Sequence, residues 1–453
     1  MRAVYVASVI VVAGCHQVPS PRGGGAIPEP AEKAARATEP SPFDIDVPDG
    51  YRVELVGDKL TYPTGIAFGD KGRIFVIESG SANGPARLLE LTPQGTTELA
   101  TGDHVPWTGI AYRDGALYVA EGGERDGGRI VRFDLPDLKQ TVLVDNLPSL
   151  GDHHTSGPVV ASDGWVYFGQ GTATNSGIAD RPDQHDIPCR DVTLAGTNFE
   201  AGGTSTGAYL PFGTPSEKGQ VIKGQLPCSG AIMRVKNTGG PVELVAWGFR
   251  NPAGLALDNG ALYATDNGYE TRGSRPVFGS ADVLWKVEMS HWYGWPDFSE
   301  GRPLTASFYS EGDGKPRGFL LADHPERPRE PRAYLPVHSS ADGLDFTHGE
   351  AFGYPGSAFI ALFGDMVPAP VGFEIVCVDP RTGDIAEFAR NHGDKPGPAS
   401  LKKQRGFERP VAVRFDPSGR SLYVVDFGVA GAEPQPESGR IWKITKEAHH
   451  ADD

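Results

Sequence analysis

The stretch Gly109-Ile-Ala-Tyr-Arg-Asp-Gly-Ala-Leu-Tyr-Val-Ala-Glu121 decides the fold of this chain. It contains two short apolar runs joined by Asp-Gly, which is the sequence signature of a β-hairpin. The same order of a small residue, alternating positions, a connection containing glycine, an apolar run and an acid or amide recurs along the chain. The six copies begin at Gly65, Gly109, Gly157, Gly254, Gly343 and Ala412.

Further apolar runs between the copies supply candidates for outer strands, such as residues 87–91, 129–133, 231–235, 283–287 and 373–378. Six repeats of two to four strands, without helical periodicity, predict an all-β fold. The expected architecture is a six-bladed β-propeller with long inter-strand loops over residues 46–447. We expect the last strand, 440–445, to share the closing blade with the first, 51–55, because this pairing removes exposed sheet edges.

The composition of the 453 residues agrees with this architecture and limits the partners. The 60 glycines and 39 prolines are too many for a helical bundle, while 39% hydrophobic residues suffice for a core. The formal net charge of −16 argues against nucleic-acid binding, because a phosphate backbone needs a basic surface.

The N-terminal residues predict export. Residues 1–14 combine a basic Arg2 with an apolar stretch too short to span a membrane, as in a signal peptide. The sequence Val12-Ala13-Gly14-Cys15 resembles a bacterial lipoprotein box with Cys15 as the lipidated residue; the alternative is an ordinary signal peptide with a chance cysteine. We therefore expect a protein on the periplasmic or cell-surface side, held to the membrane only by this anchor. A flexible tether over 15–45 and a disordered tail over 448–453 complete this organisation.

The remaining cysteines indicate one disulfide. Cys189 and Cys228 bracket a Gly/Thr/Pro-rich insertion of roughly residues 172–229, and export implies an oxidising compartment, so we expect these two residues to be bonded. Cys377 lies in an apolar run and is expected as a buried free thiol. The spacing does not fit a zinc site.

The hairpin geometry predicts a polar ring at one rim of the central channel, because a hairpin begins and ends on the same side. The second strands end at Glu78, Glu121, Gln170, Asp266, Asp365 and Asp426. Two interpretations stay open for this ring. It is either a solvated polar collar or a source of ligands, Asp266 among them, for Ca²⁺, which prefers hard oxygen donors.

The positions three residues before each copy reach the same rim. They are Tyr62, Pro106, His154, Asn251, Ser340 and Arg409, with Trp107 and Arg250 beside them. Neutral histidine is the usual general base, and arginine is a bidentate donor to a carboxylate or a developing oxyanion. These residue types predict a site at the rim, with Trp107 as a candidate contact. The basic stretch 402–409, which contains Arg405, is either a solvated loop or a receptor for an anionic cofactor or substrate.

Four further motifs carry a family resemblance. They are Trp247-Gly-Phe-Arg-Asn-Pro-Ala-Gly-Leu-Ala256, Asp266-Asn-Gly268, Ala281-Asp-Val-Leu-Trp285 and His291-Trp-Tyr-Gly-Trp-Pro-Asp297. Over about residues 48–446 the chain resembles the glucose/sorbosone dehydrogenase family. The resemblance implies a soluble sugar dehydrogenase with a six-bladed propeller that depends on pyrroloquinoline quinone (PQQ).

The resemblance also implies roles for individual residues. His154, in His-Thr-Ser-Gly, matches the catalytic base, and Arg250 matches the arginine near the quinone and the substrate oxygen, with Asn251 beside it. Arg409, with Arg405 close by, matches the arginines that bind the cofactor carboxylates. Gly268 and Tyr269 occupy the place where backbone carbonyls hold the catalytic Ca²⁺.

The resulting hypothesis is a quinoprotein that oxidises a sugar or polyol. His154 would take the hydroxyl proton while hydride passes to PQQ, assisted by Ca²⁺ and Arg250. The electrons would leave to an external acceptor, because the sequence has no Cys-x-x-Cys-His haem motif. The alternatives are a Ca²⁺-dependent lactonase-type hydrolase and a non-catalytic, surface-anchored propeller that binds a glycan or a protein.

Overall fold

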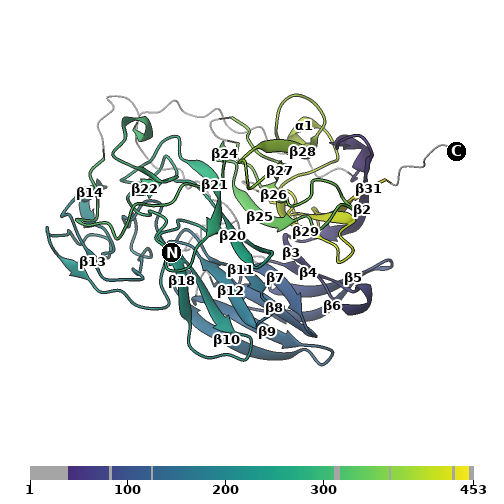
Figure 1. Cartoon of the computed structure of the whole chain (residues 1–453), viewed down its shortest axis with the longest axis horizontal. Coiled ribbons are helices and arrows are strands. Elements are labelled where there is room, and N and C mark those ends of the chain that lie inside the picture. Colours follow the sequence, from purple (N-terminus) through teal and green to yellow (C-terminus); the bar gives the residue numbers. More distant parts are fainter. Residues whose placement is uncertain are drawn as a thin grey trace, which may run out of the picture.

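Each predicted hairpin forms the inner part of one antiparallel sheet, and six such sheets surround a central axis (Figure 1). The predicted all-β, six-bladed propeller is thereby confirmed. The computed structural model describes residues 39–80, 84–123, 126–310, 317–366, 369–430 and 434–447. The expected signal peptide (1–14), the Cys15 anchor, most of the 15–45 tether and the 448–453 tail lie outside these residues.

The first three blades follow one another along the chain. Blade 1 contains β3 (Pro63–Phe68), β4 (Ile74–Glu78), β5 (Ala86–Thr92) and β6 (Gly95–Gly102). Blade 2 contains β7 (Trp107–Arg113), β8 (Ala116–Glu121), β9 (Gly128–Asp134) and β10 (Lys139–Leu147). Blade 3 contains β11 (Thr155–Val160), β12 (Trp165–Gln170), β17 (Ala231–Lys236) and β18 (Glu243–Trp247).

The last three blades include strands from near both ends of the described chain. Blade 4 contains β19 (Gly254–Asp258), β20 (Ala261–Asp266), β21 (Ala281–Val287) and β24 (Ala333–Val337). Blade 5 contains β25 (Ala341–Phe346), β26 (Ala358–Leu362), β27 (Glu374–Val378), β28 (Ile385–Asn391) and the outer β1 (Ile45–Asp46). Blade 6 contains β29 (Pro410–Phe415), β30 (Ser421–Asp426), β31 (Gly439–Lys446) and β2 (Tyr51–Leu60). The pairing of β2 with β31 confirms the predicted closing blade.

Helical elements are few and short. They are η1 (Pro42–Asp44), η2 (Asp70–Gly72), η3 (Ser307–Tyr309) and α1 (Ala399–Lys402). Within the part of the chain that the structure describes, none has the length and apolar character needed to cross a membrane.

The hairpin turns follow from their Asx-Gly pairs. Asp114 and Gly115 have φ angles of 48° and 80°, and Asn259 and Gly260 have 48° and 79°. Two consecutive positive φ values define a type I′ turn, whose twist matches that of the flanking strands. The turn residues therefore fix the register of these two inner hairpins.

The small residue that opens each repeat lies where neighbouring inner strands pass one another. A Cβ atom on Gly109 would lie 1.7 Å from the carbonyl oxygen of Gly157 in the next blade. A Cβ atom on Gly254 would lie 2.1 Å from the carbonyl oxygen of Asp342. Glycine is therefore required at these two positions, because a side chain would collide with the backbone of the next blade.

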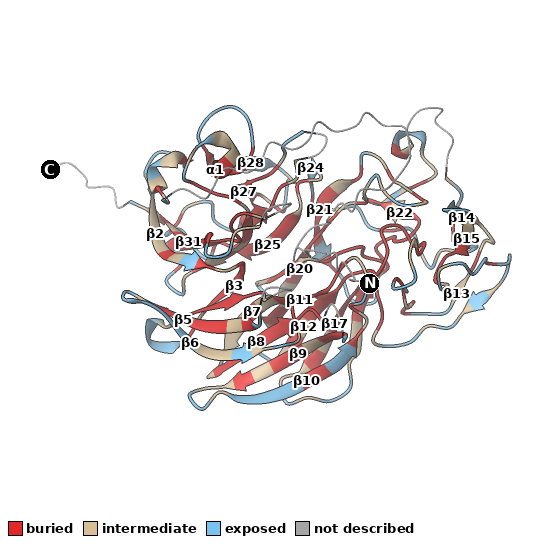
Figure 2. Cartoon of the chain, turned by 180° about the vertical axis from the view of Figure 1, so that it is seen from behind, coloured by how far each residue is buried: buried red, intermediate tan, exposed pale blue. Residues whose placement is uncertain are grey.

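The hydrophobic cores lie largely between adjacent blades, where Figure 2 shows the strands predominantly buried. One core joins Phe359 of β26, Phe415 of β29 and Trp442 of β31, and therefore links blades 5 and 6. Cys377 is buried in the same core as a free thiol, as the sequence predicted.

A lateral region projects from blades 3 and 4 and has its own core. We define it as residues 172–229, 268–280 and 288–332, of which 311–316 are not described. Its short strands are β13 (Val192–Thr193), β14 (Asn198–Ala201), β15 (Thr204–Gly207), β16 (Val221–Ile222), β22 (Phe298–Ser299) and β23 (Arg302–Pro303). Leu194, Trp295 and Leu320 belong to its apolar core. Figure 1 shows β13, β14 and β22 away from the propeller axis.

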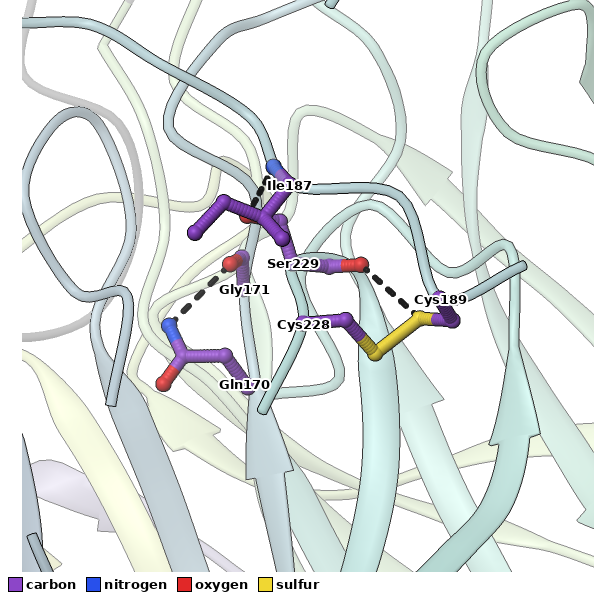
Figure 3. The surroundings of a disulfide bond; sticks show 6 residues. All are labelled: Gln170, Gly171, Ile187, Cys189, Cys228 and Ser229. Carbon is purple, nitrogen blue, oxygen red and sulfur yellow. Dashed lines mark hydrogen bonds between the residues drawn. A yellow bond between two sulfur atoms is a disulfide. The ribbon is translucent and has the colours of Figure 1, made fainter. Parts of the chain in front are cut away.

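The predicted disulfide closes this region onto blade 3. Cys189 and Cys228 are bonded, and Cys228 lies shortly before β17 (Figure 3). Ile187 and Ser229 flank the bond and exchange two hydrogen bonds, from Ile187 N to Ser229 Oγ (3.0 Å) and from Ser229 N to Ile187 O (2.9 Å). The disulfide therefore ties Cys189, within the insertion, to the point where the chain returns to blade 3.

Candidate active site

A cavity of about 70 Å³ lies in the central channel between the inner strands. Each blade lines it with the residue that precedes the small residue of its repeat: Thr64, Thr108, Ser156, Ala253, Asp342 and Val411. In three blades this residue is a hydroxyl that donates to a carbonyl oxygen of the next blade. Thr64 donates to Trp107 O (2.6 Å), Thr108 to Thr155 O (2.7 Å) and Ser156 to Pro252 O (2.5 Å).

His154 lies immediately before β11 and lines this cavity. Its Nδ1 is 3.3 Å from the carbonyl oxygen of Ser149, so Nδ1 carries the proton and Nε2 carries the lone pair. Nε2 is buried and has no hydrogen-bond partner among the described residues. Burial lowers the pKa of His154 to about 4, so the imidazole is neutral at neutral pH. A neutral imidazole with an unpartnered lone pair on Nε2 can accept a proton, as a general base must.

His153 and Asp152 line the same cavity but have other partners. His153 Nδ1 is 2.7 Å from Thr172 O, and burial lowers the pKa of this residue to about 3. Asp152 forms ion pairs with Arg272 (2.7 Å) and Arg181 (3.1 Å). His154 is therefore the better candidate for proton transfer.

The acids that end the second strands hold the backbone of the rim and do not line the channel cavity. Asp266 accepts hydrogen bonds from the backbone N–H of Arg250 (3.1 Å) and Asn251 (2.7 Å) and from Trp285 Nε1 (3.3 Å). Asp426 in blade 6 makes the equivalent bonds to Glu408 N (2.9 Å), Arg409 N (2.8 Å) and Trp442 Nε1 (3.3 Å).

The expected polar ring at the channel mouth therefore does not form around this cavity, since none of its six members lines it. Over the described ranges, no cluster of three or more His, Cys, Asp or Glu side chains suited to a metal ion occurs. Asp266 instead fixes the path of the segment that carries Arg250 and Asn251.

A second, smaller cavity of about 20 Å³ is lined by four of the predicted site residues: Arg250, Asp266, Gly268 and Tyr269. Arg250 is 2% exposed, and desolvation together with the nearby Arg272 lowers its pKa to about 10. Its neighbour Asn251 lines the channel cavity and donates from Nδ2 to Asn267 Oδ1 (2.7 Å). The Arg250–Asn251 pair thus joins the two cavities.

The carbonyl oxygens of Gly268 and Tyr269 belong to peptide groups that are oriented by the N–H groups of the following residues. Tyr269 N donates to Ser280 Oγ (2.8 Å), and Glu270 N donates to Asn175 Oδ1 (3.0 Å). Among the described residues no hydrogen bond ends on either carbonyl oxygen. Two unused carbonyl oxygens suit a hard cation such as Ca²⁺, so these residues fit the predicted metal role.

Arg409 and Arg405 lie in different surroundings. Arg409 Nη1 donates to Gly364 O (2.6 Å), and its guanidinium lies over the rings of Phe363 (4.8 Å) and Phe373 (5.1 Å). Burial lowers its pKa to about 10. Arg405 is half exposed and bonds through its backbone N to Asp44 Oδ2 (2.8 Å), beside the outer strand β1. The structure therefore does not bring Arg405 to the cavities.

Trp107 is fully buried in the core shared by blades 1 and 2, close to Phe133. This placement favours packing over contact with a ligand. None of the described cavities contains His154, Arg250 and Arg409 together.

Two residues of the site escaped sequence reasoning. Asp342 lines the channel cavity, and both of its carboxylate oxygens are buried without a hydrogen-bond partner among the described residues. Its position before Gly343 of the repeat was the signal that could have found it. Asn175 bonds to the Arg250 guanidinium from an irregular segment five residues after β12, where no periodic pattern marks it.

No protein-family model and no curated protein matches the sequence. The fold, however, matches solved structures. The soluble aldose sugar dehydrogenase (Asd) from Escherichia coli, in the apo form, matches with a TM-score of 0.56 and 16% identity over 88% of this chain and 100% of that chain. A Trichoderma reesei protein of Carbohydrate-Active Enzymes Family AA12 matches with 0.58 and 17% identity over 91% and 99%. The PQQ-bound aldose sugar dehydrogenase (Adh) from Streptomyces coelicolor matches with 0.53 and 17% identity over 88% and 99%.

These matches span nearly the whole length of the solved structures. Identities of 16–17% establish a common fold. The resemblance to soluble PQQ-dependent sugar dehydrogenases is confirmed at that level.

Proposed function

We propose that this chain is a quinoprotein oxidoreductase that oxidises a sugar or polyol, using PQQ and Ca²⁺ and an external electron acceptor. The observation that carries the proposal is His154, a buried neutral imidazole with an anchored Nδ1 and an unpartnered Nε2 in the channel cavity. It lies on a fold shared with aldose sugar dehydrogenases, one of them PQQ-bound.

The residues of the chain would divide the work. His154 Nε2 accepts the proton of the substrate hydroxyl, while the Nδ1–H bond to Ser149 O keeps the ring in place. Arg250 offers a guanidinium to the oxygen on which negative charge develops. When bound, PQQ would supply the hydride acceptor, and Ca²⁺ held by the carbonyl oxygens of Gly268 and Tyr269 would polarise it.

The cofactor's carboxylates would need cationic partners, and Arg409 is the best placed of the two predicted arginines. Among the described residues its guanidinium donates one hydrogen bond, to Gly364 O, and it lies against two phenylalanine rings. This leaves further N–H groups of a five-donor side chain for an anion. Arg405, paired with Asp44, is not needed in this proposal.

Reconstitution tests the proposal directly. The purified protein, loaded with PQQ and Ca²⁺, should reduce a dye acceptor in an aldose-dependent manner. His154→Ala should lower the rate by about 10²-fold or more, the usual contribution of a positioned general base. His392→Ala is the matched control, because His392 pairs with Asp46 at the outer edge of blade 5. Equal rates for His154→Ala and the wild type would contradict the role of His154.

The same preparation separates the two alternative functions. Lactone opening that needs Ca²⁺ but not PQQ would replace the redox proposal by a hydrolase. Glycan or protein binding without turnover of either substrate class would replace it by a binding propeller, because a fold alone does not set a function.

Export and lipid attachment at Cys15 remain part of the proposal. The bonded Cys189–Cys228 pair is in keeping with an oxidising compartment. Expression of the full chain with labelled fatty acid should mark the wild type and leave Cys15→Ala unlabelled. Labelling of both chains, or of neither, would contradict a lipid anchor at this cysteine.

A further inference from the structure

Asn175 holds the guanidinium of Arg250 by one edge. Arg250 Nε lies 3.1 Å from the carbonyl oxygen of Asn175 and 3.2 Å from its Oδ1, and Arg250 Nη2 lies 3.0 Å from the same Oδ1. Both side chains are 2% exposed. We infer that Asn175, a residue of the lateral region, is the positioning residue that aims Arg250 at the reacting oxygen. This inference rests on the proposed function.

The amide of Asn175 is itself fixed from the other side. Its Nδ2 donates to the carbonyl oxygens of Glu270 (2.9 Å) and Arg272 (3.1 Å), and its Oδ1 also accepts from Glu270 N (3.0 Å). Both N–H groups are used, so the amide has only one possible orientation. A flipped amide would point its N–H groups at the cationic guanidinium, which is unfavourable. Asn175 is therefore held in the observed orientation and supports Arg250 rigidly.

The side chain of Asn175 is neutral, so it holds the guanidinium of Arg250 without offsetting its positive charge. Glu270 Oε1 is 3.7 Å from Nη2, and the other oxygen of Glu270 pairs with Arg272. A carboxylate in place of the amide would still accept from the guanidinium, but it would lose the two bonds that Nδ2 donates to Glu270 O and Arg272 O and would offset the positive charge in a buried site. An asparagine positions the cation and leaves its charge for the substrate.

The position of Asn175 also links the lateral region to the chemistry. The carbonyl oxygen of Asn175 lies 3.5 Å from Nε1 of Trp295, a member of the lateral core. Arg250 comes from the segment between blades 3 and 4. The lateral region thus supplies Asn175, the residue that holds the guanidinium of Arg250. The six hairpins alone do not provide this residue.

Two variants and a matched control separate positioning from folding. Asn175→Ala removes the acceptors of the side chain, and Asn175→Asp keeps an acceptor but adds a charge. Ser176→Ala is the control, because Ser176 is equally buried on the same segment and bonds through Oγ to Arg275 O (2.6 Å), away from Arg250.

We expect kcat of the PQQ-loaded enzyme to fall at least tenfold in Asn175→Ala and in Asn175→Asp, with a smaller change in KM, and to stay within twofold in Ser176→Ala. In an Arg250→Ala background, Asn175→Ala should have no further effect, because the two residues act as one unit. A wild-type kcat in folded Asn175→Ala or Asn175→Asp, or an undiminished effect in the Arg250→Ala background, would overturn the inference.

A readout without the cofactor uses the apo-protein. Phenylglyoxal modification of Arg250, located by mass spectrometry, should become at least tenfold faster in Asn175→Ala and remain at the wild-type rate in Ser176→Ala. Unchanged modification in Asn175→Ala would overturn the clamp. If the wild type shows no PQQ-dependent activity but the modification rates differ as expected, the proposed function fails while the clamp between the two residues stands.

Discussion

The blade ring and the lateral region are held together by different means. Each blade repeats one hairpin and buries apolar side chains against its neighbour, so its stability is spread over many equivalent contacts. The lateral region has one apolar core, and its irregular backbone is tied by a disulfide and a fully buried ion pair between Arg275 and Asp297. Single changes should therefore be tolerated differently in the two regions.

The strongest test of this difference is the buried ion pair. Arg275 Nη2 is 3.0 Å from Asp297 Oδ1, and both side chains are inaccessible to solvent. Arg275→Met removes the guanidinium from the buried Asp297 carboxylate, which then keeps, among the described residues, only His324 and the N–H groups of Leu320 and Leu321, and should cost about 3–5 kcal/mol of unfolding free energy. Hydrogen exchange should rise in the lateral region and stay low in blades 5 and 6.

The exposed pair of Arg381 with Asp379 gives the matched control, and Arg381→Met should leave the free energy of unfolding nearly unchanged. If both regions open together in Arg275→Met, the lateral region is not a separate unit of stability.

The second test removes the covalent staple. Cys189 and Cys228 are 39 positions apart, and a loop of this size gives a disulfide worth about 3–4 kcal/mol in the chain-entropy model. The double change to serine should lower the free energy of unfolding by that amount, and a reducing agent should do the same to the wild type. Cys377→Ala keeps the disulfide and should respond to the reducing agent as the wild type does, whereas the double serine variant should not respond; an equal response of the double variant would contradict the assignment.

The third test addresses the rim through pH. Burial lowers the pKa of His154 to about 4, below the ordinary value of 6.5. The unfolded chain therefore takes up this proton first, and stability present above pH 6.5 is lost as the pH falls toward 4. At pH 4.5 the loss should be about 2 kcal/mol for this residue, and His154→Gln should remove it. Identical pH profiles of unfolding for both proteins would contradict the buried neutral imidazole.

The smallest effect is expected inside the ring itself. Asp342 occupies the position where Thr64, Thr108 and Ser156 donate to the next blade, and burial raises its pKa well above the ordinary value. Asp342→Ser should stabilise the protein by about 1–2 kcal/mol at pH 7, because it removes a buried acid without a partner. The gain should shrink as the pH falls below the ordinary carboxyl range, where the wild type is protonated in both states. Thermal unfolding at both pH values provides the measurement, and a loss of stability at pH 7 would show that Asp342 has an unseen partner.

The hairpins were predictable because turn chemistry and alternation are local. Asp114-Gly115 specifies its own turn, whatever the rest of the chain does. The direction of the strand-ending acids was not predictable in this way. Asp266 points to the backbone of Arg250 and Asn251 because that segment passes over it, and this path depends on the packing of the whole blade.

The site was predictable where it coincides with the repeat. His154 and Asn251 both line the channel cavity from equivalent positions. Arg405 and Asn175 show the limit. Arg405 pairs with a residue 361 positions away, and Asn175 reaches Arg250 across 75 positions from a segment without regular structure. Contacts of this kind follow from tertiary packing, which no local pattern encodes.

The closing of blade 6 has a consequence for biosynthesis. Strand β2 is made early, but its partner β31 is the last strand along the part of the chain that the structure describes. The ring cannot close until β31 has been synthesised, so β2 has an unpaired edge while the other described strands are made. A product that lacks β31 would leave the edge of β2 unpaired. Quality-control proteases would then degrade it as an incompletely folded protein.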